Sequence, residues 1–115
     1  MSGQHFSKPI TIFIKQKSVL AYIASKCLHT NKAAIVLGSY IFIYGCNKEQ
    51  FIANTKWFNH ELQHVHQYQQ LGFVIFISKY IYYSFKYGYY LNPFEVDARN
   101  HELKRANIFA NVRIK

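Results

Sequence analysis

Apolar and polar residues alternate along residues 10–15 (ITIFIK), and most of the apolar ones are β-branched, which predicts a β-strand. Two more short apolar runs, 33–37 and 40–44, are separated by only two residues, and a joint of this length predicts a hairpin. Between the first strand and the hairpin, Ser18 is placed to cap a helix from Val19 to about Leu28. This half of the chain therefore predicts a small sheet and one helix.

The second half of the chain has helical periodicity. Residues 47–50 are polar and predict a loop. A helix is then expected from Asn54 or Thr55 to Leu71. The segment 73–87 predicts a further helix that Gly88 breaks, and Asn92-Pro93 suits the cap and the first position of a final helix. The order of elements therefore predicts an α+β fold.

The helix expected over 55–71 contains His60-Glu61-Leu62-Gln63-His64, an H-E-x-x-H motif. Residues four apart lie on the same face of a helix, so His60 and His64 can present two imidazole nitrogens to one metal ion. Glu61 lies beside that face, where its carboxylate can take a proton from a metal-bound water. An isolated motif of this kind also recurs by chance on ordinary exposed helices, so the rest of the site decides whether it binds metal.

A catalytic zinc site needs a third protein ligand and one position for water. The extended motif that contains a third histidine is absent, because Gln67 and Gln70 occupy the positions of its glycine and its histidine. Glu95 is the candidate instead: it lies in the first turn of the helix that starts at Pro93, and one intervening helix could bring that turn back to the motif helix. A first-turn glutamate can also be no more than a favourable partner of the helix dipole.

Two blocks of the sequence carry a resemblance to a known family: His60-Glu61-Leu62-Gln63-His64-Val65-His66-Gln67 and Asn92-Pro93-Phe94-Glu95-Val96-Asp97-Ala98. With them the chain resembles the gluzincin-type zinc metallopeptidases, and is most similar to short, single-domain minimal gluzincins over roughly residues 10–106. The resemblance implies that His60, His64 and Glu95 hold Zn²⁺ and that Glu61 is the general base and acid.

The expected fold is a compact α+β, zincin-like domain spanning residues 1–115. A small sheet of about three strands would pack on the motif helix, beside the helix that carries Glu95. The expected activity is hydrolysis of a peptide or protein substrate through a zinc-bound water that Glu61 activates. Strand 40–44 could bind the substrate by strand addition. The partly apolar tail, 107–115, could be mobile or fold over the cleft and inhibit the enzyme.

The two motifs do not assign roles to the residues around the proposed ligands. Four of them are candidates to support a ligand or to stabilise the oxyanion: Gln67, Tyr90, Arg99 and His101. The tyrosines between residues 80 and 90 are expected to serve packing. His66 points away from the motif face and is expected to be exposed, and Asp97 is expected to be solvated or paired with an arginine.

Charge and composition limit the classes of partner and the cellular locations that are expected. The 14 Lys and Arg residues outnumber five Asp and Glu, but they are spread along the chain rather than gathered in a stripe, so specific nucleic-acid binding is not expected. Segment 73–91 carries Lys79 and Lys86 on one helical face, and neither a transmembrane helix nor a signal peptide is recognised. With two cysteines and no disulfide framework, a cytoplasmic location is expected.

Two functions of other classes remain open. The chain could be a catalytically weak or inactive zinc-binding interaction module. It could also be a basic, aromatic membrane-surface protein in which the motif is incidental, since it combines a net charge of +9 with ten Tyr and ten Phe. For a peptidase, contact with a membrane surface is possible but not expected, and the sequence does not predict the oligomeric state.

Overall fold

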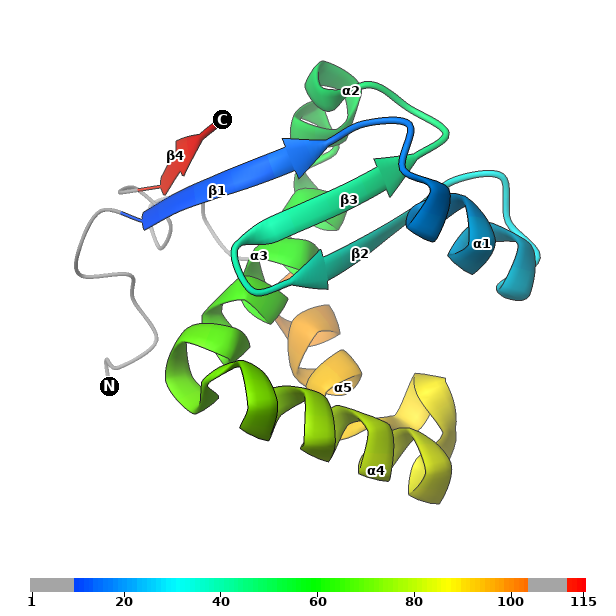
Figure 1. Ribbon diagram of the computed structural model, residues 1–115, viewed down its shortest axis with the longest axis vertical. Helices are drawn as coiled ribbons and strands as arrows, with labels where there is room; N and C mark the ends of the chain where they lie inside the picture. Colours follow the sequence, from blue (N-terminus) through cyan, green and yellow to red (C-terminus); the bar gives the residue numbers. More distant parts are fainter. Residues whose placement is uncertain (1–9, 104–111) are drawn as a thin grey trace.

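The computed structural model describes residues 10–103 and 112–115, and within them a four-stranded mixed sheet. The strands are β1 (Ile10–Lys15), β2 (Ala33–Leu37), β3 (Tyr40–Tyr44) and β4 (Val112–Ile114), in the order β2-β3-β1-β4 (Figure 1). β2 runs antiparallel to β3, and β1 runs parallel to both of its neighbours. The α+β class and the three predicted strands are confirmed. The expectation of about three strands missed β4, whose partner lies at the other end of the sequence.

Five helices accompany the described sheet: α1 (Val19–Cys27), α2 (Lys48–Ala53), α3 (Thr55–Leu71), α4 (Phe73–Leu91) and α5 (Pro93–Asn100). The predicted helix starts at Ser18 and Asn54 are confirmed, because each side chain accepts a hydrogen bond from a backbone N–H in the first turn. The predicted break at Gly88 is also confirmed. Its φ of 83° interrupts the regular helix inside α4, and glycine adopts that conformation without steric cost.

The predicted loop over residues 47–50 is wrong, because Asn47 starts the short helix α2. The Asn47 side chain accepts a hydrogen bond from the Gln50 N–H at 2.8 Å, and the Gln50 side chain accepts one from the Asn47 N–H at 2.9 Å. This reciprocal capping satisfies two backbone donors at the helix start. A polar run that contains its own cap was therefore mistaken for a loop.

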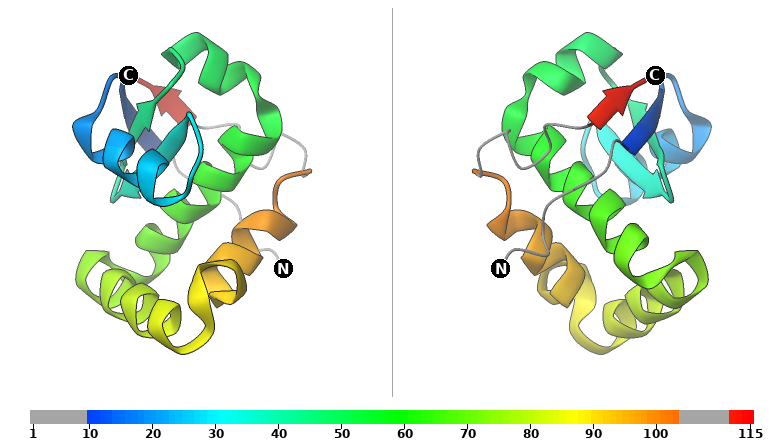
Figure 2. Two further views of the ribbon diagram at one scale, coloured as in Figure 1. Left: turned by 90° about the vertical axis from the view of Figure 1, so that its right-hand side faces the viewer. Right: turned by 90° about the vertical axis from the view of Figure 1, so that its left-hand side faces the viewer.

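The sheet lies between α1 on one side and α3 on the other (Figure 2). The core between the sheet and the α2–α3 segment contains Ile12, Ile41 and Ile43 from the strands and Phe51, Leu62 and Val65 from the helices. Leu62 and Val65 lie on the back of the motif helix, so burial of this apolar stripe turns the motif's own face away from the sheet core. The face with His60 and His64 is directed towards α4 and α5 instead.

The two edges of the described sheet differ in what lies beside them. β2 forms one edge, and its residues line a cavity that is described below. β4 forms the opposite edge, beside β1, so this part of the C-terminal tail does not cover the cavity. The rest of the predicted cleft-covering segment, residues 107–111, lies outside the described residues.

None of the helices in the described ranges has the length and apolarity needed to cross a bilayer.

Candidate metal centre

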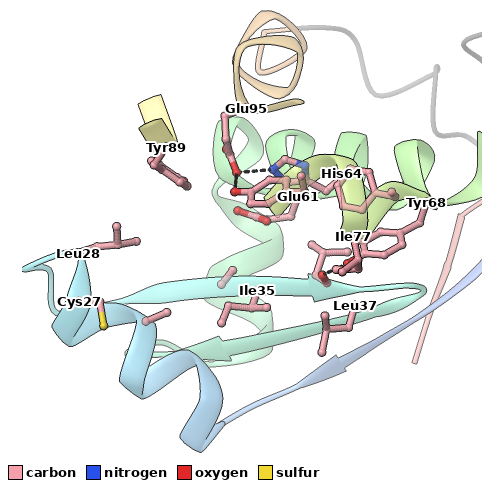
Figure 3. Close-up of a pocket in the computed structure, with 15 residues that line it drawn as sticks. Cys27, Leu28, Ile35, Leu37, Glu61, His64, Tyr68, Ile77, Tyr89 and Glu95 are labelled. Atoms are coloured by element: carbon pink, nitrogen blue, oxygen red, sulfur yellow. Dashed lines mark hydrogen bonds and ion pairs between the residues drawn. The ribbon is translucent and has the colours of Figure 1, made fainter. Parts of the chain in front are cut away.

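Three side chains from two distant segments of the sequence converge between α3 and α5. The nitrogens of His60 and His64 and the carboxylate of Glu95 offer ligand atoms that all lie within 4.8 Å of one another. His60 Nε2 is 3.0 Å from Glu95 Oε1. His64 Nε2 is 3.3 Å from Glu95 Oε2 (Figure 3). His64 and Glu95 are buried, and His60 is nearly so. One helical turn and the start of a separate helix thus meet at a single point.

Asn92 places the Glu95 turn. It is fully buried, and its side-chain oxygen accepts a hydrogen bond from the Phe94 N–H at 2.9 Å, which caps α5. Its amide nitrogen donates to the Tyr80 carbonyl at 3.0 Å and to Ser84 Oγ at 2.9 Å, both on α4. These hydrogen bonds hold the start of α5 against α4. In this position the Glu95 side chain faces α3.

The outer nitrogen of each imidazole has a partner that accepts hydrogen bonds. His60 Nδ1 lies 2.8 Å from Glu102 Oε2, and His64 Nδ1 lies 2.8 Å from Gln67 Oε1. A carboxylate or amide oxygen can only accept here, so each Nδ1 carries a proton and donates it. In the neutral imidazole this leaves the Nε2 lone pair directed at Glu95, which is the tautomer and orientation that a metal ligand requires.

The orientation of the Gln67 amide follows from its other contacts. Its nitrogen donates to Asp97 Oδ2 at 2.9 Å and to the Phe94 carbonyl at 3.1 Å, so its oxygen is the atom that faces His64. Gln63 donates to the same Asp97 oxygen at 2.8 Å. Asp97 therefore accepts hydrogen bonds from two glutamine amides and fixes, from α5, the glutamine that supports His64. Its side chain is still 44% exposed, so the expected solvation is confirmed.

The donor set fits a zinc ion. Two Nε2 lone pairs and two carboxylate oxygens face one another at 3.0 and 3.3 Å with both Nδ1 protons directed outwards. Lone pairs at such distances need a cation between them, either a proton or a metal ion. Two neutral imidazoles and one carboxylate are ligands that zinc prefers, and together they leave a fourth position for water.

The close approach of these side chains shifts the pKa values of His60 and Glu95. Burial lowers the pKa of His60, but its hydrogen bond to Glu95 and the neighbouring carboxylates outweigh burial and raise that pKa to about 9. The Glu95 pKa is held well below its usual range, because its bonds to both imidazoles outweigh burial. Both shifts show that the three side chains are arranged for a negative carboxylate next to positive charge.

Glu61 occupies a different electrostatic position. It is 7% exposed, and burial raises its pKa to about 7 even though the imidazoles of His64 and His60 lower it. A carboxyl with a pKa near neutrality can both accept and return a proton at neutral pH. Glu61 also lines the cavity beside His64 and Glu95, so it can reach a molecule bound there (Figure 3).

The cavity has a volume of about 370 Å³ and runs from the cluster along the edge of the sheet. Residues 34–37 of β2 form one wall, the end of α1 closes one end, and Ile77 of α4 lies on the opposite wall (Figure 3). Tyr80, also on α4, is a further lining residue. β3, which was expected to be the accessible strand, lies inside the described sheet between β2 and β1, so that expectation is wrong. The strand that faces the cluster is β2.

Two tyrosines that sequence reasoning assigned to packing line this cavity. The Tyr80 hydroxyl donates a hydrogen bond to Glu95 Oε2, and Tyr89 lies near the same carboxylate. Burial and the negative charge of Glu95 raise the pKa of both tyrosines, so both remain protonated donors. No spacing in the sequence singles them out, because their position depends on how α4 crosses α3.

Three of the four residues suggested around the ligands lie elsewhere. Tyr90 is 68% exposed, and the Arg99 guanidinium covers its ring at 3.9 Å. His101 Nδ1 donates to the Asp97 carbonyl at 2.8 Å. All three are described by the structure, and none of them lines the cavity. Only Gln67 lies against a proposed ligand.

Two further differences concern burial and support. His66 was expected to be exposed but is 4% exposed, close to Asp97 and His101. Glu102, which orients His60, was not identified from the sequence. Glu102 lies in the turn that follows α5, where helical periodicity does not fix the direction of a side chain.

Comparison of the chain with protein-family models, with curated proteins and with solved structures found no match. The resemblance to gluzincins therefore rests on the two sequence motifs alone.

Proposed function

We propose that the protein is a zinc-dependent peptidase with a zincin-like arrangement, in which His60, His64 and Glu95 hold the ion. The observation that carries this proposal is the convergence of the three donors within 4.8 Å, from one helical turn and a distant helix start. Chance placement of an H-E-x-x-H motif does not explain why Glu102 and Gln67 also orient both imidazoles with Nε2 inwards.

A zinc ion in this site would lower the pKa of a bound water to about 7 and polarise a substrate carbonyl. The chain's own residues would do the rest. Glu61 accepts the proton of the attacking water and returns it to the leaving amine, since its carboxylate lines the cavity with a pKa of about 7. The Tyr80 hydroxyl would hold Glu95 in place through its hydrogen bond. The Tyr89 hydroxyl, which also lines the cavity, would be the donor that turns to the carbonyl oxygen as it gains charge.

The edge strand β2 suggests how a substrate would be oriented. An extended peptide that adds to an exposed strand edge is held by backbone hydrogen bonds, whatever its side chains. Residues 34–37 of β2 and the Glu61–His64–Glu95 group line the same cavity, so a peptide added there would bring its backbone to the reacting groups. The apolar walls of the cavity, including Ile35, Leu37 and Ile77, would favour apolar side chains.

The proposal is tested by incubating the purified chain with one equivalent of zinc and a mixture of unstructured peptides. Mass spectrometry is expected to detect new peptide termini, a chelator to abolish their formation, and added zinc to restore it. Cleavage that continues unchanged after complete removal of zinc would contradict the proposal, because the proposed site needs the ion.

Replacing the partner of His60 should weaken the site without removing a ligand. The Glu102→Ala variant is expected to bind zinc roughly 10- to 100-fold more weakly, because His60 loses the acceptor that fixes its tautomer and ring orientation. Competition with a coloured chelator measures the affinity. Glu49→Ala is the matched control, since Glu49 lies in the first turn of α2 and outside the site. Equal zinc affinities of the two variants would show that Glu102 does not support His60.

A further inference from the structure

α4 presents an apolar and basic surface that the site does not use. Four large side chains, Val74, Ile81, Tyr82 and Phe85, lie on one side of the helix and are 72%, 51%, 57% and 89% exposed. Lys79 and Lys86 lie along one border of this stripe and are also exposed. These six residues are called the α4 outer face below.

The opposite side of α4 is already occupied. Phe76 is 3% exposed and belongs to the hydrophobic core, and Ile77 and Tyr80 pack against that core and line the cavity. Only this inner side of α4 therefore packs against the rest of the fold, and the apolar side chains of the outer face remain exposed. A Phe that is 89% exposed in the middle of a helix contributes nothing to the packing of the described chain.

The distribution of charged side chains indicates that a partner of this face carries negative charge. All five acidic side chains lie in the described residues, and four of them, Glu61, Glu95, Asp97 and Glu102, are engaged in or around the metal centre. Only Glu49 lies away from it, on α2, which lies at the far end of the molecule from α4 (Figure 1). The α4 outer face thus has lysines with no acidic neighbour to balance them, in a chain of net charge +9.

The lysine and tyrosine side chains of this face are arranged as in an interfacial helix. Lys86 Nζ lies 5.7 Å from the centre of the Tyr82 ring and 5.3 Å from that of Tyr87. Long basic side chains can reach headgroups while apolar neighbours enter the acyl boundary, and tyrosine prefers the layer between them. Helices that combine an apolar stripe with bordering lysines lie in the plane of a bilayer surface.

We infer that the α4 outer face docks onto an anionic lipid bilayer, with the helix parallel to the membrane plane. Val74, Ile81 and Phe85 enter the headgroup boundary, and Lys79 and Lys86 contact anionic headgroups. The inner side of α4 keeps its contacts with the core, so docking leaves the lining of the cavity unchanged. The inference goes beyond the proposed peptidase function and does not depend on the metal centre.

A second copy of the chain fits this face less well than a bilayer does. In a two-fold dimer the same surface meets itself, so the lysines of both copies would lie at one interface that contains no acidic side chain of the face to pair with them. Two chains of charge +9 also repel each other, and no acidic side chain on the face offsets that repulsion. An anionic bilayer satisfies both the apolar stripe and the lysines.

Cosedimentation with vesicles tests the inference, with phosphatidylcholine vesicles compared with vesicles that also contain phosphatidylserine. The chain is expected to bind the anionic vesicles, and to bind more weakly as salt is added. Phe85→Ser is expected to lower the affinity by roughly tenfold or more, because a large apolar side chain no longer enters the boundary. Lys86→Glu is expected to lower it about fivefold or more, since one lysine near such a surface accounts for about that factor.

Two matched controls separate docking by the α4 outer face from nonspecific binding to vesicles. Leu103→Ser removes an apolar side chain that is 83% exposed but lies beyond α5, and Lys48→Glu makes the same charge change on α2. Both are expected to bind vesicles like the unaltered chain. Circular dichroism checks that Phe85→Ser remains folded, and Val74→Ser gives a second change on the same stripe.

Three results would overturn the inference. The first is the absence of binding to anionic vesicles. The second is an equal loss of binding in the variants and in their controls, which would mean that net charge alone attracts the chain. The third is a dimer in solution that Phe85→Ser dissociates, together with no binding to vesicles, because the face would then be covered by a second copy.

Discussion

Glu61→Gln is expected to retain bound zinc and to lose peptide hydrolysis by roughly 10²- to 10⁴-fold in kcat/KM, the contribution of a positioned general base. The amide has nearly the shape of the carboxylate but cannot accept a proton, whereas Glu61 lines the cavity with its pKa raised to about 7 by burial. Glu61 is not one of the three converging donors, so the ion should remain. The measurements are kcat/KM on a cleaved peptide and metal content by elemental analysis.

The same variant separates the enzyme from a zinc-binding interaction module. Glu49→Gln makes the matched substitution on α2, outside the site, and should leave hydrolysis unchanged. Full activity in Glu61→Gln would remove Glu61 from the mechanism. Bound zinc with no hydrolysis of any peptide by the unaltered chain would favour the interaction module instead.

Glu95→Gln is expected to abolish the stabilisation of the fold by zinc. At a free zinc concentration about 100 times its Kd, the unaltered chain should gain about 2.7 kcal/mol in free energy of unfolding. The variant should gain none at that concentration, because it lacks the only carboxylate among the three converging donors. Without zinc the variant should still fold, since the amide introduced can donate a hydrogen bond to an Nε2 lone pair at about the place of Oε1 or Oε2.

Thermal unfolding with and without zinc measures this effect for both proteins. Glu49→Gln is again the control, and it should show the same zinc-dependent shift as the unaltered chain. An equal shift in Glu95→Gln would mean that zinc is held without Glu95. A failure of Glu95→Gln to fold in the absence of zinc would show that the carboxylate is needed for packing, and Glu95→Asp would then test the role of the charge.

Local signals were sufficient for the elements that carry the cluster. The spacing of His60 and His64 is a property of any helix, and the Asn92-Pro93 start placed Glu95 in the first turn of α5, as observed. The break at Gly88 was also readable, because it depends on the conformational freedom of one residue. Each of these predictions needed only a few neighbouring positions in the chain.

The surroundings of the cluster depended on contacts between distant elements. Which strand forms the edge of the sheet is decided by the pairing of β1 with β3, so the choice of β3 over β2 failed. The burial of His66 and the approach of Tyr80 to Glu95 follow from how α4 and α5 cross α3. Periodicity within one helix contains no information on these crossings.

The most direct test of the central claim is the zinc K-edge X-ray absorption spectrum of the chain loaded with one equivalent of zinc. We predict two imidazole nitrogens at about 2.0–2.1 Å and a first shell completed by oxygen at about 2.0–2.2 Å, as two histidines, Glu95 and water would give. Cys27 lines the same cavity and could offer a competing ligand. A sulfur shell at about 2.3 Å, or a shell without imidazole scattering, would contradict the assignment of His60, His64 and Glu95 as the ligands.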